Sequence, residues 1–128
     1  MYVYHFHQSY GRYGDIYGIF IVSDEGEKIL RALVGMEIDF GEALGRKSET
    51  VGVLYAEELI RAEATDEEIL TVCRVLREEA PVGGRRWTTI SGYNPLDYIG
   101  ETGIDWDALL LKAGVDPDPS EPVGADEF

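Results

Sequence analysis

The alternation of side chains near the N-terminus constrains the fold of this chain more than any other feature. From Tyr2 to His7 every second residue is aromatic, and this period of two is typical of a β-strand. The segment from Ile16 to Val22 is β-branched and aromatic and predicts a second strand. Residues 8–15 between them are rich in turn-forming glycine, serine and aspartate. The two strands are therefore expected to form an antiparallel hairpin with a long loop.

The rest of the chain mixes the two hydrophobic periods. Apolar residues recur at the spacing of a strand in some segments and at the spacing of a helix in others. The pattern predicts strands at 36–40, 51–55 and 87–90, and helices at 24–34, 65–80, 95–100 and 106–113. Residues 56–63 fit either a helical turn or an extension of the preceding strand.

Several helix ends carry recognisable signals. Thr65 with Glu68 forms a capping box, and Pro81 is expected to stop that helix after Ala80. Asn94 before a proline predicts another helix start. A further helix is expected to open at Asp105 and to close at Gly114.

This order of elements predicts an α+β fold, a mostly antiparallel sheet of about four strands with helices packed on one face. The connection from the second strand through a helix to the third could instead be a parallel crossover, and the pattern leaves both open. One domain is expected over residues 1–114. Residues 115–128 contain several prolines and five acids without a base, and are expected to form a flexible, disordered acidic tail.

Net charge is the strongest functional signal. The 128 residues include 25 Asp and Glu against 11 Lys and Arg, a formal net charge of −14, although 45% of the residues are hydrophobic. A chain of this charge repels nucleic acid and anionic lipid, so direct binding to either is not expected. The favoured partner is a basic protein or a nucleic-acid-binding complex, whose groove a dense acidic face could occupy. The alternative is that the charge only serves solubility.

The cysteine content and the length of the apolar runs indicate the cellular compartment in which the protein is expected. Cys73 is the only cysteine, which excludes an intrachain disulfide and fits a reducing cytoplasm. The N-terminus lacks the pattern of a signal peptide, and no apolar run approaches the ~20 residues of a membrane helix. A cytoplasmic protein is therefore expected.

No residue pattern identifies a catalytic centre. His5 and His7 would share a face of the first strand, but a metal site would need a third ligand such as Asp15 or Glu37. The simpler interpretation is two histidines on the polar face of an edge strand. Cys73 lies on the apolar stripe of a predicted helix and is expected to be buried. No enzyme, metal or cofactor is therefore expected, and a small metal-dependent enzyme using the two histidines is kept as an alternative.

Two groups of residues are the candidate partner contacts. The first is acidic and is placed on the predicted helix 65–80, and the second consists of aromatic residues in the hairpin loop, where packing does not require them. These candidates are Glu67, Glu68, Glu78 and Glu79, with Tyr10 and Tyr13. The other tyrosines of the hairpin, Tyr2, Tyr4 and Tyr17, are expected to line the core.

Three segments carry a resemblance to a known group of proteins. These are Gly18-Ile-Phe-Ile-Val, Leu33-Val-Gly-Met-Glu-Ile-Asp-Phe-Gly-Glu-Ala-Leu-Gly-Arg-Lys-Ser-Glu, and Val51-Gly-Val-Leu. Over about residues 16–60 the chain resembles small acidic accessory proteins of phages and prophages. The resemblance implies a mobile-element protein in the cytoplasm of a bacterial host cell, and it assigns no site residues.

Size and charge complete the functional expectation. Small acidic phage proteins include anti-CRISPR and other anti-defence inhibitors, some of which mimic nucleic acid. We therefore expect a non-enzymatic inhibitor that binds a basic partner through protein–protein contacts. An immunity protein that neutralises a basic toxin is the alternative from the same charge. The sequence leaves the oligomeric state open.

Overall fold

The computed structural model describes residues 1–45 and 47–116, which form an α+β fold and confirm the predicted class. A four-stranded antiparallel sheet has the order β5-β1-β2-β6, and β3 and β4 pair separately. The strands are β1 (Tyr2–Ser9), β2 (Asp15–Val22), β3 (Glu37–Asp39), β4 (Val51–Val53), β5 (Leu59–Ala62) and β6 (Trp87–Gly92). The α-helices are α1 (Asp24–Leu33), α2 (Asp66–Leu76), α3 (Ile99–Thr102) and α4 (Trp106–Ala113). Single 3₁₀ turns are η1 (Gly11–Tyr13), η2 (Ala56–Glu58) and η3 (Pro95–Tyr98).

The β1–β2 hairpin is the centre of the sheet and confirms the predicted antiparallel pair, with a loop of residues 10–14 that is shorter than the predicted 8–15. The two strands pair over their whole length, from Tyr2 opposite Val22 to Ser9 opposite Asp15. η1 makes the turn, where Gly11 has a φ of 63° that glycine adopts without a steric cost. β5 joins the outer edge of β1 and β6 joins the outer edge of β2.

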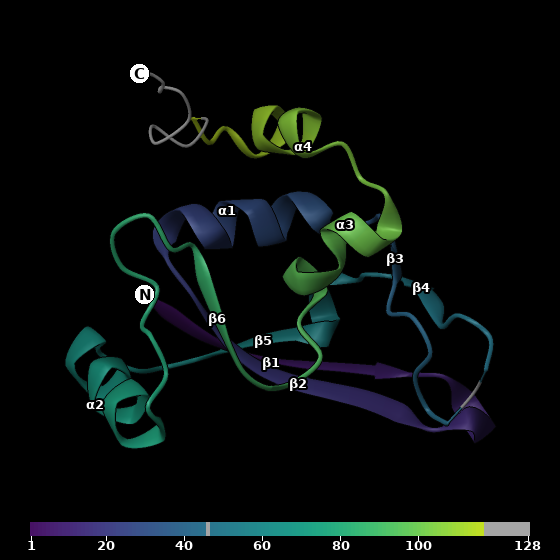
Figure 1. Cartoon of the computed structure of the whole chain (residues 1–128), viewed down its shortest axis with the longest axis horizontal. Helices are drawn as coiled ribbons and strands as arrows, with labels where there is room; N and C mark the ends of the chain where they lie inside the picture. Colours follow the sequence, from purple (N-terminus) through teal and green to yellow (C-terminus); the bar gives the residue numbers. More distant parts are fainter. Residues whose placement is uncertain (46, 117–128) are drawn as a thin grey trace.

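The inner face of the sheet carries the main hydrophobic core. Tyr4, Phe6 and Phe20 are fully buried there, and the rings of Tyr4 and Phe20 stack with centroids 5.9 Å apart. α1, α3 and α4 lie on this side, above the sheet in Figure 1. These three helices form the layer predicted on one face of the sheet, whereas α2 lies outside it.

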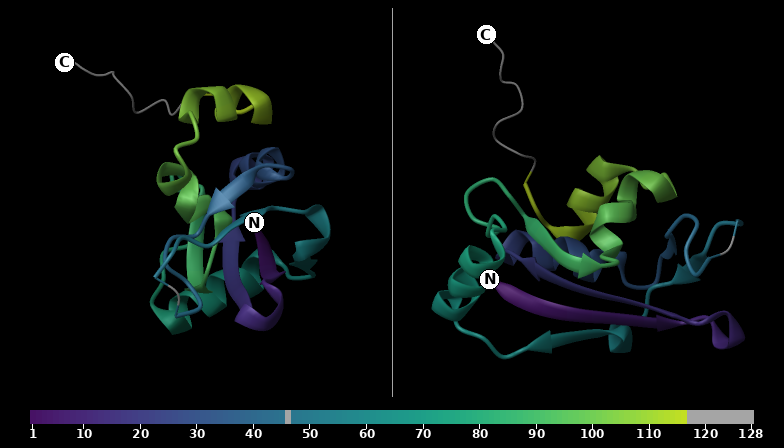
Figure 2. Two further views of the ribbon diagram at one scale, coloured as in Figure 1. Left: turned by 90° about the vertical axis from the view of Figure 1, so that its right-hand side faces the viewer. Right: turned by 60° about the horizontal axis from the view of Figure 1, so that its bottom comes forward.

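α2 packs on the opposite, outer face. Its buried residues Ile69 and Cys73 contact Ile21 of β2 in a second, smaller core. Figures 1 and 2 place α2 beside the N-terminal end of β1, away from the hairpin turn. The outer face is therefore covered at one end by a single short helix.

α2 is shorter than predicted. It ends at Leu76 because Arg77 adopts a left-handed conformation with φ of 59°, and the Glu78 N–H donates to the Cys73 carbonyl at 2.8 Å. The prediction that this helix continues to Ala80 was wrong. The Thr65–Glu68 capping box at its start is confirmed.

The smaller elements resolve the alternatives that the sequence left open. β3 pairs with β4 antiparallel in a sheet of its own, so the connection through α1 is not a parallel crossover. Residues 56–63 begin with the expected helical turn, η2, and continue as β5, which pairs with β1 and is therefore a separate strand rather than an extension of β4. The helix that begins after Asn94 continues through η3 into α3 and ends at Thr102, past the predicted end at 100.

The C-terminal end of the described chain extends the domain slightly. α4 begins after Asp105 and ends before Gly114, as predicted. Val115 was assigned to the flexible tail but is only 7% exposed and packs against the main core. The packed domain therefore includes Val115, and residues 117–128 of the expected tail lie outside the described residues.

Candidate functional site

The outer face of the sheet has an exposed half that α2 does not reach. His5 of β1 lies directly between Ile60 of β5 and Ile19 of β2, and the next outward pair is His7 with Tyr17. Ile60 is 61% exposed, Tyr17 52% and Ile19 40%. We call these five side chains the open sheet face. On the side of the sheet away from α1 and α4, Figure 2 (right) shows no helix over this end of β1.

α2 adds apolar surface to the same side of the molecule. Val72 and Leu76 follow Ile69 at helical spacing and so lie on the stripe that turns toward the sheet, yet each remains 48% exposed. Exposed apolar residues scattered singly are common, whereas residues gathered side by side mark interaction surfaces. The outer side of the sheet therefore carries several exposed apolar side chains of the kind that gather at interaction surfaces.

The polar groups of the open sheet face hold its aromatic rings in place. The His7 Nε2 lies 2.9 Å from the Asp15 Oδ2, and the Tyr17 hydroxyl donates to the same oxygen at 3.3 Å. The His7 and Tyr17 rings stack with centroids 4.7 Å apart. The hydrogen bond from His7 lowers the pKa of Asp15, and the charge of Asp15 raises the pKa of Tyr17. A surface fixed in this way loses little side-chain freedom on binding.

Within the described residues the two histidines do not form part of a three-ligand metal site. Asp15 lies beside His7, but Glu37, the other candidate, lies on β3 in the separate two-stranded sheet. Among residues 1–45 and 47–116, no three His, Cys, Asp or Glu side chains gather closely enough to hold a metal ion. Cys73 is buried, as predicted, and burial raises the pKa of its thiol.

The four predicted glutamates do not share one face of a helix. Glu67 and Glu68 are exposed in the first turn of α2, whereas Glu78 and Glu79 follow its end. Glu68 accepts the Thr65 N–H at 2.8 Å, which lowers the pKa of its carboxyl group. Glu79 forms an ion pair with Arg85. Placing all four on one helix was wrong, because the left-handed Arg77 ends α2 between the two pairs.

The tyrosines of the hairpin have different surroundings from those expected. Tyr10 is half-buried and its hydroxyl donates to Gln8, whereas Tyr13 is 52% exposed with the Arg12 guanidinium 5.4 Å from its ring centroid. Tyr17 was predicted to line the core, which was wrong. Tyr17 lies on the outer face of the sheet. The prediction failed because β2 carries apolar residues on both of its faces, so the composition of the strand does not indicate which residues point inward.

A cluster of carboxylates elsewhere was not anticipated. Asp39 of β3, Glu49 before β4 and Glu101 of α3 come together although they are far apart in the sequence. A hydrogen bond with Asp39, its charge and the charge of Glu101 raise the pKa of Glu49. No local sequence signal brings these three residues together. The cluster shows that the acidic charge of the chain is not concentrated on α2.

Comparison of the chain with protein-family models, with curated proteins and with solved structures gives no match. Within the described residues, no helix combines the length and the apolar character required to cross a membrane. The function therefore has to be inferred from the surface of this molecule, on which the open sheet face is the most distinctive feature.

Proposed function

We propose that the chain is a non-enzymatic binding protein that holds a protein partner on its open sheet face. The observation that supports this most directly is the row of Ile60, His5 and Ile19 across three neighbouring strands, with no described element covering it. Burying apolar area contributes about 25 cal/mol per Å² to association. A flat row of branched side chains beside the Tyr17 ring gives a partner such area on a rigid support.

Charge determines the kind of partner. The chain has a net charge of −14, and exposed Glu67 and Glu68 lie on α2, on the same side of the sheet as the open sheet face. The partner is therefore a protein with an apolar contact surrounded by basic groups. Complementary charge of this kind raises the association rate and disfavours acidic competitors, while the apolar contact slows dissociation of the complex.

Proteins that bind nucleic acid have basic surfaces, and such surfaces can also include exposed apolar residues. We assign the chain to the inhibitors that occupy such a surface, as an anti-defence protein of the anti-CRISPR kind in a bacterial cytoplasm. The acidic charge and the resemblance to phage accessory proteins support this assignment. An immunity protein that neutralises a basic toxin would use the same surface, and the identity of the partner distinguishes the two.

A photo-crosslinking experiment tests the location of the contact. Tyr17 is replaced by photo-reactive benzoylphenylalanine in one sample and Leu111 in another, and both are irradiated in bacterial lysate. Leu111 is 84% exposed on α4, on the opposite side of the sheet, and so controls for nonspecific capture. We expect a basic protein to be crosslinked from position 17 and not from position 111. Equal crosslinking from both positions would contradict the proposal.

The captured partner then allows a quantitative test. Ile19→Ser and Leu111→Ser each remove an apolar side chain that is at least partly exposed, and a thermal melt first establishes that each variant is folded at the temperature of the binding assay. Ile19→Ser should weaken binding about tenfold, and Leu111→Ser should change it less than about twofold. Affinity should also fall as salt increases from ~50 to ~500 mM. Unchanged affinity for Ile19→Ser, or binding indifferent to salt, would contradict the proposal.

A further inference from the structure

β5 forms a free edge of the four-stranded sheet. The strand order β5-β1-β2-β6 leaves β5 with one neighbour, and Figure 2 (right) shows it at the lower border of the sheet with no described element beyond it. The backbone of Ile60, Arg61 and Ala62 bonds to β1 and to no other described element. A strand in an antiparallel ladder directs its N–H and C=O groups alternately to its two sides, so about half of these groups on β5 point away from β1.

The opposite edge of the sheet, β6, is irregular. Ile90 is an extra residue in its ladder, because Thr89 and Ser91 pair with consecutive residues of β2. Gly92 then ends the strand with a φ of 69°. Irregularities of this kind hinder an edge strand from accepting another strand. β5 pairs with β1 without a register shift and contains no proline, so it is the better edge for strand addition.

The apolar row of the open sheet face ends at this edge. Ile60 is 61% exposed, compared with 40% for Ile19, and β5 has a neighbouring strand on one side only. A further strand beside β5 would place a side chain about 4.5–5.5 Å from that of Ile60, the usual spacing of cross-strand pairs. The free edge and the open sheet face therefore form one continuous surface.

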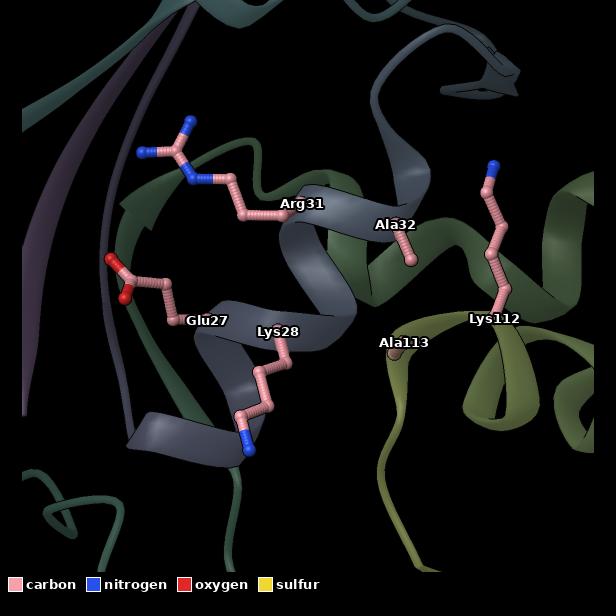
Figure 3. A pocket seen from close by; sticks show the side chains of 6 residues that line it. All are labelled: Glu27, Lys28, Arg31, Ala32, Lys112 and Ala113. Atoms are coloured by element: carbon pink, nitrogen blue, oxygen red, sulfur yellow. The ribbon is translucent and has the colours of Figure 1, made fainter.

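Acidic residues lie at both ends of β5. Glu57 belongs to η2, which precedes the strand, and Glu63 follows it directly. Both are exposed, and neither forms an ion pair with a described residue. The base of the strand, Arg61, is bound to Glu27 at 2.9 Å, and Figure 3 shows the Glu27 side chain extending from α1 toward the strands. The ends of β5 therefore favour a partner with basic residues.

We propose that the partner adds an extended segment to β5 as a further strand of the sheet. This inference rests on the proposed function and specifies how the same partner binds. Main-chain hydrogen bonds to β5 supply affinity, and alternate side chains supply specificity. The segment places β-branched residues beside Ile60 on the outer face and basic residues near Glu57 and Glu63. A second copy of this chain is disfavoured as the occupant, because each copy has a net charge of −14.

The synthetic peptide Lys-Lys-Val-Thr-Val-Thr-Val-Lys-Lys is the probe for strand addition. Its valines share one face of an extended strand, and its lysines lie at the ends. Two further peptides carry N-methyl groups that remove backbone donors, one at the threonines and the other at the valines. Consecutive N–H groups of a strand point to opposite sides, so only one of these two sets can bond to β5.

Fluorescence anisotropy of the labelled peptides with the full chain at ~150 mM salt measures their affinity. The parent peptide should bind. One methylated peptide should bind about tenfold more weakly, and the other should lose less than about threefold. No binding of the parent peptide, or the same affinity for both methylated peptides, would overturn the proposal. If a partner is crosslinked from position 17 but the peptides lack this pattern, strand addition is wrong while the open sheet face remains the binding surface.

Apolar variants of the chain test the location. Ile60→Ser should weaken binding of the parent peptide about fivefold or more, and Val51→Ser should change it less than about twofold. Val51 is the matched control, since it is 45% exposed on β4 in the separate two-stranded sheet. A thermal melt first establishes that each variant is folded. Unchanged affinity in Ile60→Ser, or an equal loss in Val51→Ser, would overturn the proposal.

Charge variants test the ends of the strand. Glu57→Gln/Glu63→Gln should weaken binding of the parent peptide about fivefold or more. Glu37→Gln/Asp107→Asn removes the same charge from exposed positions on β3 and α4 and should change it less than about twofold. Equal losses in the two double variants would overturn the proposal, because they would show nonspecific attraction.

Discussion

The two faces of the four-stranded sheet come from the same strands but differ in what covers them. On the inner face Tyr4, Phe6 and Phe20 are fully buried beneath α1, α3 and α4. On the outer face α2 buries Ile21 at one end, while Ile19, two positions earlier in β2, is 40% exposed. The alternation along a strand therefore determines the face on which each residue lies. The placement of the helices determines which parts of each face are buried.

The two faces also show that apolar side chains can serve two different purposes in this sheet. Inner-face residues stabilise the fold, since their burial removes apolar area from water. Ile19, Ile60 and Tyr17 contribute less to the stability of the free chain, because between 40% and 61% of each residue remains exposed. Their common position on one uncovered surface is what the proposed contact with a partner requires.

Truncating one aromatic residue on each face of β2 tests most directly whether the two faces contribute differently to stability. Phe20→Ala should lower the free energy of unfolding by about 3–5 kcal/mol, because it leaves a cavity in the main core. Tyr17→Ala should lower it by less than about 1 kcal/mol, because half of that side chain is already in water. Urea denaturation followed by circular dichroism measures both, and similar losses for the two variants would contradict the assignment of faces.

A glycine substitution tests how tightly the inner face is closed. A Cβ at Gly18 would lie 1.6 Å from the Tyr93 carbonyl oxygen, so Gly18→Ala should cost about 3 kcal/mol through displacement of that backbone. Gly84→Ala is the matched control, since nothing lies within 4 Å of the position of its Cβ. Its effect should stay within about 0.5 kcal/mol. A harmless Gly18→Ala would show that residue 93 does not pack against β2 as described.

Alkaline titration tests the buried hydroxyl of the inner face. Burial and the hydrogen bond to Glu27 raise the pKa of Tyr4 from 10.0 to about 12. The folded chain then keeps this proton where the unfolded chain loses it, so the stabilisation is complete below pH 10 and disappears as the pH rises to about 12. The loss should be on the order of 2 kcal/mol, and Tyr4→Phe should remove it. An unchanged alkaline profile in Tyr4→Phe would contradict this role.

Acid titration tests the corresponding pair on the outer face, where the smallest effect is expected. The hydrogen bond from His7 lowers the pKa of Asp15. The folded chain therefore releases this proton more readily than the unfolded chain. The resulting stabilisation is present above the ordinary carboxyl pKa and is lost as the pH falls through the lowered value. Urea denaturation at a series of acidic pH values should show a slightly flatter acid limb for Asp15→Asn, and an unchanged limb would contradict this role.

Local signals in the sequence predicted much of the fold. The period of two in β1, the capping box at Thr65 and the pair Asp105 and Gly114 each act within a few residues, and each identified the correct element. The end of α2 was missed because it depends on a left-handed Arg77, which carries no glycine-like signal. The position of α2 on the outer face depends on contacts with Ile21 that local patterns do not encode.

The candidate sites were less predictable because they are assembled from distant segments. The open sheet face requires the register of β5 against β1, which places Ile60 beside His5. The carboxylates of Asp39, Glu49 and Glu101 likewise come from three separate segments of the chain. Acidic composition drew attention to charge, but it did not indicate which surfaces would carry the charged residues.

Methyl NMR of the isoleucine side chains tests the central claim most directly. The partner crosslinked from position 17 is added to chain labelled at its isoleucine methyl groups. We predict that the signals of Ile19 and Ile60 shift or broaden, while those of buried Ile29 and Ile38 stay in place. Changes confined to Ile104 on the helical side, with Ile19 and Ile60 unaffected, would contradict the open sheet face as the binding surface.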